Sequence, residues 1–467
     1  MVSHDYFLAV RAAQALNRSG FMAYAIGGAV RDMYLDRHPK DFDLVTDATP
    51  EEILMIKEFS RAKYNDPAQA FGVTRVSFGG REVEIATFRK DLQAHRGRKA
   101  TKVAYADLEE DVMRRDFTIN ALALDFSTGF IIDYTGGISD LDRGIIRFIG
   151  DPGRRIQEDP LRIMRAVRFK NQLGFTYHPS TAEGIRTAVS KGKVEDIATD
   201  RLREELTNLL VHPSRRGAFA DLDNFGILER ILPEVTAGKG VSQPANFHSE
   251  GDVWNHELII LGCLPDNSSK RLAWAALLHD IGKGPTMTKP AKPGDRIRFN
   301  RHYAVGAEMA KTALRRLKFS KKDIEQISWM IYHHMSIDDL PWMRPSRQQK
   351  MMGHPAFEDL LELHKADAAA SKQPGKPHAR PRFEKIEKLW KSYQDKTPEN
   401  KQPSLKRDLG IDGRWLLKNF KKELGNKPGP AVGRVLKELD EWYRDEGVKE
   451  ESLYRKKTRE LLKSHQD

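Results

Sequence analysis

Two hydrophobic patterns divide the chain. Over the first 150 residues, short β-rich runs at 23–26, 75–78, 83–87, 131–134 and 145–148 accompany stretches such as 7–16, where apolar residues follow helical spacing. Strands mixed with helices on this scale predict an α/β unit.

From about Arg154 onward, apolar residues recur at i, i+3 and i+4 between turn signals, and strand signals cease. This pattern predicts that the remainder of the chain is helical. Lys, Gln, Pro, Gly and Arg displace apolar residues near 238–244 and 371–382, as is typical of linkers. We therefore expect four blocks, at residues 1–150, 151–240, 245–372 and 383–467.

The composition is that of a basic protein. A net charge of +12 favours a polyanionic partner, nucleic acid before membrane, over the alternative of a merely basic protein. No apolar run approaches the roughly 20 residues of a spanning helix, and no export signal stands out. Cys263 is the only cysteine, so it forms no internal disulfide. We expect a cytoplasmic protein without a membrane partner, and no protein partner is evident.

A glycine turn followed by two acids is the most informative candidate site. Residues 27–32 read GGAVRD, and Asp41 and Asp43 follow. Two acids one residue apart on a strand point to the same face. There they can hold two divalent cations for transfer of a phosphoryl group, while the glycines let backbone approach the phosphates. A pair of solvated acids is the alternative.

Two basic motifs follow. Residues 114–121 (RRDFTINA) predict a short helix whose Arg, Asp and Asn side chains suit a triphosphate and a ribose. Residues 157–169 (QEDPLRIMRAVRF) place Asp159, Arg162 and Arg165 at i, i+3 and i+6 of a predicted helix. The alternative for Arg165 and Arg168 is pairing with acids of neighbouring helices.

The ordered set of motifs resembles the class II tRNA nucleotidyltransferases, the family of bacterial CCA-adding enzymes and poly(A) polymerases. The matching segments lie at 27–32, 41–43, 114–121, 133–137 and 158–169. Each is weak alone, and their order over about 170 residues makes the resemblance specific.

The resemblance implies an α+β chain: a polymerase-beta-like head with a small mixed β-sheet, then an all-α neck, an HD domain and a helical tail. It implies Mg²⁺ at Asp41 and Asp43, with Glu84 as a third candidate carboxylate, and transfer of nucleotides from CTP or ATP to the 3′ end of tRNA. In the family, Asp159 and Arg162 would select the base. The candidate nucleotide-binding residues are Gly28, Arg31, Arg115, Asp116, Asn120, Asp159, Arg162, Arg165 and Arg168.

One loop departs from the family pattern. Relatives carry an aspartate and a proline in a flexible loop at this point, whereas residues 92–101 here read LQAHRGRKAT. Because that loop is implicated in the switch from C to A addition, the departure bears on the final adenylation step.

A second constellation spans the third block and resembles HD-domain phosphohydrolases, chiefly through residues 277–283 (LLHDIGK). Imidazole and carboxylate side chains on several helices suit one or two transition-metal ions. The candidate ligands are His256, His279, Asp280, His302, His334 and Asp367. His333 is an alternative to His334, and a structural role is the alternative for any single histidine. A phosphatase or cyclic phosphodiesterase activity is the implied chemistry.

The last block reads as helices around a glycine and proline turn at 425–434, with basic residues at 456–459. Such a turn can bind a tRNA backbone phosphate or simply cap a helical tail. The leading prediction is thus a CCA-adding enzyme with tRNA, CTP and ATP as partners. The alternatives are a CC-adding or A-adding specialist, a poly(A) polymerase, or chiefly an HD phosphohydrolase with a nucleotide-binding head.

Overall fold

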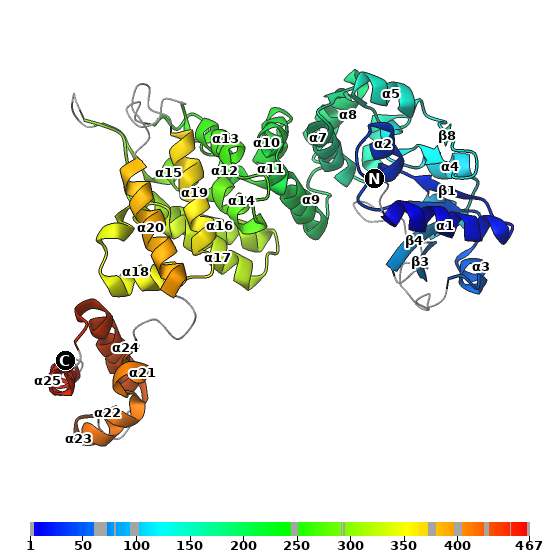
Figure 1. The fold of residues 1–467 in the computed structure, drawn as a ribbon. Coiled ribbons are helices and arrows are strands. Elements are labelled where there is room, and N and C mark those ends of the chain that lie inside the picture. Colours follow the sequence, from blue (N-terminus) through cyan, green and yellow to red (C-terminus); the bar gives the residue numbers. More distant parts are fainter. Residues whose placement is uncertain are drawn as a thin grey trace.

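The computed structural model describes residues 4–59, 72–78, 81–93, 102–243, 251–290, 292, 295–371, 380–396, 404–424, 429–448 and 450–464. The four blocks follow one another along the molecule in the order of the sequence (Figure 1). The head lies at one end, the neck helices follow, and the HD block lies at the other end with the tail beside it. We keep the names head, neck, HD block and tail for the four blocks.

The head is built on a six-stranded mixed sheet with the strand order β3-β4-β2-β1-β7-β8. Its strands are β1 (Ala23–Ile26), β2 (Asp43–Thr46), β3 (Val73–Phe78), β4 (Arg81–Thr87), β7 (Ala123–Leu124) and β8 (Ile131–Ile132). Strands β2 and β4 are parallel, with Leu44 opposite Ile85, and the other pairs are antiparallel. The register therefore brings the start of β2 level with the middle of β4.

Successive residues of a strand point to opposite faces of the sheet. Because neighbouring strand residues here are both apolar, each face of the sheet packs against other elements. Leu44 and Ile85 face helix α1 (His4–Arg18), whose Leu8 and Leu16 are buried against them. Val45 packs on the opposite face, in a cluster with residues of helix α4 (Leu108–Met113). The remaining head elements are α2 (Gly28–Tyr34), α3 (Pro50–Met55), β5 (Arg89–Gln93), β6 (Lys102–Tyr105), the 3-10 turn η2 (Thr118–Asn120), α5 (Gly137–Arg143) and β9 (Ile145–Ile146).

The neck is helical and shares one continuous apolar core with the head and the HD block. Its elements are α6 (Pro152–Glu158), α7 (Leu161–Leu173), β10 (Thr176–Tyr177), α8 (Pro179–Ser190), α9 (Thr199–Val211), α10 (Arg215–Asn224), α11 (Ile227–Ile231) and α12 (Pro233–Thr236). The HD block holds α13 (Val253–Cys263), α14 (Lys270–Leu278), α15 (Lys283–Thr286), β11 (Met287–Thr288), β12 (Arg298–Phe299), α16 (His302–Arg316), α17 (Lys321–His333), the 3-10 helix η3 (Ser336–Trp342), α18 (Pro345–Met352) and α19 (Phe357–Ala370).

The tail has a core of its own, formed by residues from Leu405 to Leu462. Its helices are α21 (Leu405–Leu409), α22 (Gly413–Asn419), α23 (Lys421–Leu424), α24 (Gly429–Glu446) and α25 (Glu451–Ser464). Helix α20 (Arg380–Lys396) instead packs on the HD block, where its Ile386 is buried in the main core. Ser346 of α18 donates to Asp445 of α24 through both backbone and hydroxyl, which joins the tail to the HD block.

Three details differ from the sequence predictions. Asp159 is not on a helix: α6 ends at Glu158, and Asp159 is extended before Pro160, which cannot continue the helix. Asp41 precedes strand β2, so Asp43 alone of the two acids belongs to the strand. Strands also occur beyond Arg154, because β10 pairs with β9 and β11 pairs with β12; these two-residue strands are too short to give a pattern. The predicted loop residues 94–101 and the turn residues 425–428 lie outside the described residues.

Candidate active sites

A cavity of about 390 Å³ lies between the head and the first helices of the neck. Its walls come from the glycine turn, β2, the segment around η2, the start of α7 and the start of α9. The lining residues are Gly27, Gly28, Arg31, Asp43, Arg114, Arg115, Asp116, Asn120, Asp159, Arg162, Arg165, Phe169 and Arg201. The cavity therefore gathers most of the predicted nucleotide-binding residues.

Acidic groups cluster at one wall of this cavity. Desolvation at the cavity wall, followed by the charges of Asp41 and Glu84, raises the pKa of Asp43, although Arg115 opposes this shift. Glu84 lies on β4 beside β2 and forms an ion pair with Arg75, with 2.7 Å between Arg75 Nε and Glu84 Oε1. A carboxylate whose ionisation is opposed by two neighbouring carboxylates fits a site for a divalent cation such as Mg²⁺, which prefers oxygen ligands.

The glycine turn is held by the residues around it. Gly27 has φ +82°, a conformation that favours glycine, and its amide donates to Leu122 O. Arg31 is buried and donates to Asn120 Oδ1 at 2.7 Å and to Asp32. The contact between Arg31 and Asn120, two residues predicted to bind nucleotide, joins the turn to η2 at the cavity wall.

Buried carboxylates orient the arginines of the 114–121 motif. Asp111 accepts from Arg114 at 2.6 Å and from Arg115 at 3.0 Å. Burial opposes ionisation of Asp111, but the charges of Arg115 and Arg114 prevail and lower its pKa. Sequence reasoning missed Asp111, whose position in an acidic helical turn carries no signal of its own.

Asp116 likewise faces Arg165 of α7, with Oδ2 2.6 Å from Arg165 Nε. Burial would raise the pKa of Asp116, yet the neighbouring Arg165 lowers it overall. Arg168 pairs with Glu205 of α9 at 2.7 Å and does not line the cavity. Both arginines therefore pair with an acid, which was the alternative to nucleotide binding predicted for them. Arg165 nevertheless also lines the cavity.

Asp159 and Arg162 line the cavity from the neck, at the junction of α6 and α7. Both oxygens of Asp159 accept from Arg201 of α9, at 3.0 and 2.8 Å. Arg162 donates to Glu158 Oε2 at 2.8 Å and to the carbonyl of Arg114 at 3.2 Å. Arg201 was missed by sequence reasoning because it lies 42 residues from its partner and in no recognisable motif.

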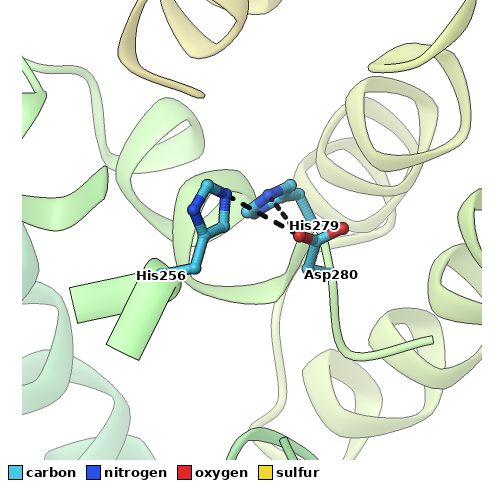
Figure 2. A group of neighbouring side chains, drawn as sticks. All are labelled: His256, His279 and Asp280. Atoms are coloured by element: carbon cyan, nitrogen blue, oxygen red, sulfur yellow. Dashed lines mark ion pairs between the residues drawn. The ribbon is translucent and has the colours of Figure 1, made fainter. Parts of the chain in front are cut away.

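The HD block brings the six candidate ligands together. His256 comes from α13, His279 and Asp280 from the end of α14, His302 from the start of α16, His334 from the end of α17 and Asp367 from α19. Figure 2 shows the rings of His256 and His279 turned toward the Asp280 carboxylate. Nε2 of these two rings lies 3.9 and 3.1 Å from Asp280 Oδ2. Two groups that could each hold an ion share Asp280: one with His256 and His279, the other with His302 and His334.

Backbone carbonyls fix the orientation of three of these rings. Nδ1 of His279, His302 and His334 lies 2.7–2.9 Å from the carbonyls of Ala276, Phe299 and Ile331. Each Nδ1 thus carries a proton, which leaves Nε2 as a lone-pair donor facing the cluster. Burial is the largest cause that lowers the pKa of His334 to about 3, so its ring is neutral, as metal ligation requires. The donor set therefore fits a divalent transition metal, with His334 rather than His333 in the cluster.

Two further charged residues surround this cluster. Lys283, the last residue of the LLHDIGK motif, contacts Asp280 Oδ2 at 2.6 Å and donates to Gln243. Glu257 is fully buried, and within the described part of the chain neither of its carboxylate oxygens accepts a hydrogen bond. Burial and the charge of Asp280 raise the pKa of Glu257 well above its ordinary value.

Comparison with known proteins assigns the chain to a family. Residues 23–147 match the poly A polymerase head domain, 174–239 the probable RNA- and SrmB-binding site of polymerase A, and 256–371 the HD domain. A multifunctional CCA protein of Nitrosomonas eutropha is 33% identical over 334 residues, covering 70% of this chain and 77% of the relative. The chain belongs to the family of CCA-adding enzymes and bacterial poly(A) polymerases.

Other members of this nucleotidyltransferase family agree in sequence and fold. The CCA-adding enzyme of Lactobacillus helveticus is 42% identical over 217 residues, which is 46% of this chain and 53% of that enzyme. The chain thus spans about half the length of the first curated relatives that it matches. The structure of the Bacillus stearothermophilus CCA-adding enzyme in complex with CTP superposes with a TM-score of 0.70 at 25% identity, covering 99% of each chain. The family's α+β head and helical remainder are therefore confirmed.

Among the helices in the described ranges, none combines the length and hydropathy of a membrane-spanning segment.

Proposed function

We propose that the chain is a tRNA 3′-terminal nucleotidyltransferase that adds C and A from CTP and ATP without a nucleic-acid template. The observation that carries this proposal is the head cavity, where Asp43, coupled to Asp41 and Glu84, lines the same space as Asp159, Arg162 and several further arginines. One cavity thus provides groups for the phosphates and groups for a base. The likeness to CCA-adding enzymes supports it.

The reaction joins the tRNA 3′-oxygen to the α-phosphorus as the bond from that phosphorus to pyrophosphate breaks. Asp41 and Asp43 would hold Mg²⁺, with Glu84 nearby, and Mg²⁺ would supply charge stabilisation for both oxygens when bound. Arg115 would bind phosphate oxygens through its planar fork. The Gly27–Gly28 backbone leaves room for the triphosphate.

Base selection would follow from donor and acceptor patterns. Asp159 only accepts and Arg162 only donates, so together they match an exocyclic amino group beside a ring nitrogen. Cytosine and adenine present that pair on their Watson-Crick edges. Guanine and uracil present a carbonyl beside an N–H, which would leave buried groups unpaired.

Incubation with labelled CTP, then ATP, and a tRNA that ends before C-C-A tests this function. Two C and one A support CCA addition, C alone a CC-adding enzyme, and a long A tract a poly(A) polymerase. Asp43→Asn should abolish incorporation, and Asp395→Asn, which changes an exposed acid on α20 outside the cavity lining, serves as the control. Absence of incorporation by the wild-type protein would refute the proposal.

We also propose that the HD block hydrolyses phosphate monoesters or cyclic diesters. The arrangement of four Nε2-presenting histidines and two carboxylates favours this second activity. In hydrolysis a water oxygen bonds to phosphorus, the ester P–O bond breaks and the leaving alcohol takes a proton. A bound divalent ion would supply Lewis acidity, and Lys283 would offset the charge of Asp280.

The second activity is tested by phosphate release after the protein is stripped of metal and supplied with single divalent ions. His279→Ala and Asp280→Ala should each lose metal, measured by elemental analysis, together with hydrolysis. Unchanged hydrolysis in these two variants would contradict the proposal.

A further inference from the structure

Phe169 lies where the neck meets the head, and aromatic contacts with the head hold its ring. It belongs to α7, lines the head cavity and is only 7% exposed. Phe117 meets it edge to face with ring centroids 5.7 Å apart, and Phe148 stacks on Phe117 at 4.8 Å. Because aromatic pairs prefer such defined geometries, the core around Phe169 sets the orientation of its ring.

Three guanidinium groups lie over this one ring. The central guanidinium carbon of Arg168 is 4.4 Å from the ring centroid, that of Arg165 is 5.1 Å away and that of Arg31 is 5.3 Å away. All three distances fall inside the range of about 6 Å in which an aromatic face attracts a cation. Arg165 and Arg168 come from α7 itself, whereas Arg31 comes from α2 of the head. The ring thus gathers positive charge from both blocks.

Two of these arginines line the head cavity, and each is held at its edge as well as at its face. Arg31 donates through Nη1 to Asn120 and through Nε to Asp32. Arg165 donates through Nε to Asp116. A guanidinium carries five N–H donors in one plane, and stacking on a ring uses its face rather than its edge. Both arginines therefore keep donors with which to bind an anion.

The ring also makes the assembly of these cations less costly. Like charges that are brought together repel, and the negative face of an aromatic ring lowers that repulsion. The attraction is larger for a desolvated ring than for an exposed one, and Phe169 is buried. A triphosphate that enters the cavity would thus meet guanidinium groups already in position, which reduces the entropy lost on binding.

We infer that Phe169 is a positioning residue for the incoming nucleotide: its ring holds Arg31 of the head and Arg165 of the neck in place to bind the triphosphate. This inference rests on the nucleotidyl transfer proposed above and assigns one determinant of nucleotide affinity. Phe169 acts through the two arginines and does not touch the reacting atoms. Weakening its ring should therefore raise KM and leave kcat nearly unchanged.

Progressive fluorination of the ring tests this role, because fluorine withdraws electron density from the ring face and changes the ring's size little. Mono-, di- and trifluorinated phenylalanines are introduced at position 169 of the full chain, and incorporation of CTP into a tRNA that ends before C-C-A is measured. KM for CTP should rise stepwise, to about tenfold for the trifluorinated ring, with kcat changed less than about twofold. A KM that does not follow the number of fluorines would indicate a role in packing alone and would overturn the inference.

The same series at Phe148 is the matched control. Phe148 is buried in the same aromatic core, and no guanidinium from the described ranges lies over its ring. Fluorination there should leave KM for CTP unchanged, and urea unfolding verifies that each variant is folded. An equal rise of KM in both series would show that fluorine acts through the core, which contradicts the inference.

Inorganic tripolyphosphate distinguishes binding through the arginines from a direct contact of the ring with the base. This competitor carries phosphates without a base, so its Ki against CTP should rise with fluorination in parallel with KM. A Ki that stays constant while KM rises would mean that the ring contacts the base instead, and the inference would be wrong.

A binding measurement separates this inference from the proposed transfer. Equilibrium dialysis with labelled CTP gives Kd without any reaction. If the wild type binds CTP but transfers none, the proposed function fails, and a Kd that rises with fluorination still supports the role of Phe169. If the wild type transfers nucleotides and KM stays constant through the series at position 169, the function stands and the inference fails. A wild type that does not bind CTP would refute both.

Discussion

At the scale of single residues, the head cavity is ordered by pairs that join distant segments. Asp159 accepts two hydrogen bonds from Arg201, and Asp116 accepts one from Arg165 Nε. Bidentate, charge-assisted pairs fix direction as well as position. The carboxylate proposed to read the base therefore has its orientation set before a nucleotide binds, and each of its oxygens keeps a lone pair that a base could use.

Replacing Arg201 should reduce the discrimination between bases more than it reduces the rate of nucleotide transfer. Arg201→Gln removes the bidentate partner, so Asp159 gains rotamers that also fit UTP or GTP. We expect the preference for CTP over UTP in kcat/KM to fall by about tenfold, the equivalent of about 1.4 kcal/mol. Competition between labelled CTP and UTP measures it.

Arg186→Gln is the control, since Arg186 is exposed on α8 and does not line the cavity. An unchanged preference in Arg201→Gln would show that the pair is structural only.

At the scale of elements, the HD cluster depends on a close crossing of two helices. An added Cβ at Gly282 would lie 2.2 Å from the His302 carbonyl and 2.6 Å from the amide of Gly306. This glycine has an ordinary φ of −75°, so proximity rather than backbone conformation requires it. The approach places His302 beside Asp280, with Nε2 3.5 Å from Oδ1.

Gly282→Ala should therefore push α16 away from Asp280. We expect a loss of about 1–3 kcal/mol in the free energy of unfolding, as for other overpacked sites, together with weaker metal retention. Urea unfolding and elemental analysis measure the two effects. At Gly284 the added Cβ would meet its nearest neighbour at 3.4 Å, an ordinary contact, so Gly284→Ala is the matched control. Equal behaviour of the two variants would contradict the crossing argument.

Neck and HD block are also joined by an ion pair. Glu234 of α12 accepts from both terminal nitrogens of Arg316 on α16, at 2.7 and 2.9 Å. Burial opposes ionisation of Glu234, but the hydrogen bonds from Arg316 prevail and lower its pKa below 4.5. A carboxyl with a lowered folded-state pKa stabilises the fold above its unfolded pKa, and this contribution is lost as pH falls through the folded value.

Glu234→Gln should thus cost about 1 kcal/mol of unfolding free energy at pH 7, allowing for solvent screening at the exposed Arg316. The cost should shrink as pH falls below 4.5, because the wild-type carboxyl then becomes neutral too. Denaturant unfolding at several pH values measures it. Glu229→Gln, at an exposed position on α11, should show no such trend. A constant difference down to low pH would exclude the linkage.

The sequence predicts those parts of the fold and of the sites that depend on residues close together in the chain. The strands and the motif residues were accessible because periodicity and spacing are local properties. Arg201 and Asp111 were not, since a carboxylate's partner is chosen by how helices pack. The interruption at Asp159 was misread as continuous helix, although Pro160 signals a break there.

At the scale of the whole molecule, the two proposed sites are far apart. The head cavity is built by the head and first neck helices, the cluster by the HD block, and these parts lie at opposite ends of the main body (Figure 1). They share one apolar core but no lining residue. Substitutions at distant sites without shared partners act independently.

Loss of one activity should therefore leave the other intact. Asp41→Ala should reduce nucleotide incorporation by more than about a hundredfold while hydrolysis of p-nitrophenyl phosphate continues, because Asp41 is exposed and its removal leaves no cavity in the core. His279→Ala should do the reverse. Both activities are measured on the same preparations, with circular dichroism to verify that each variant is folded. Parallel loss of both activities in a folded variant would show that the sites are coupled, and would require the shared core to transmit a change of conformation between them.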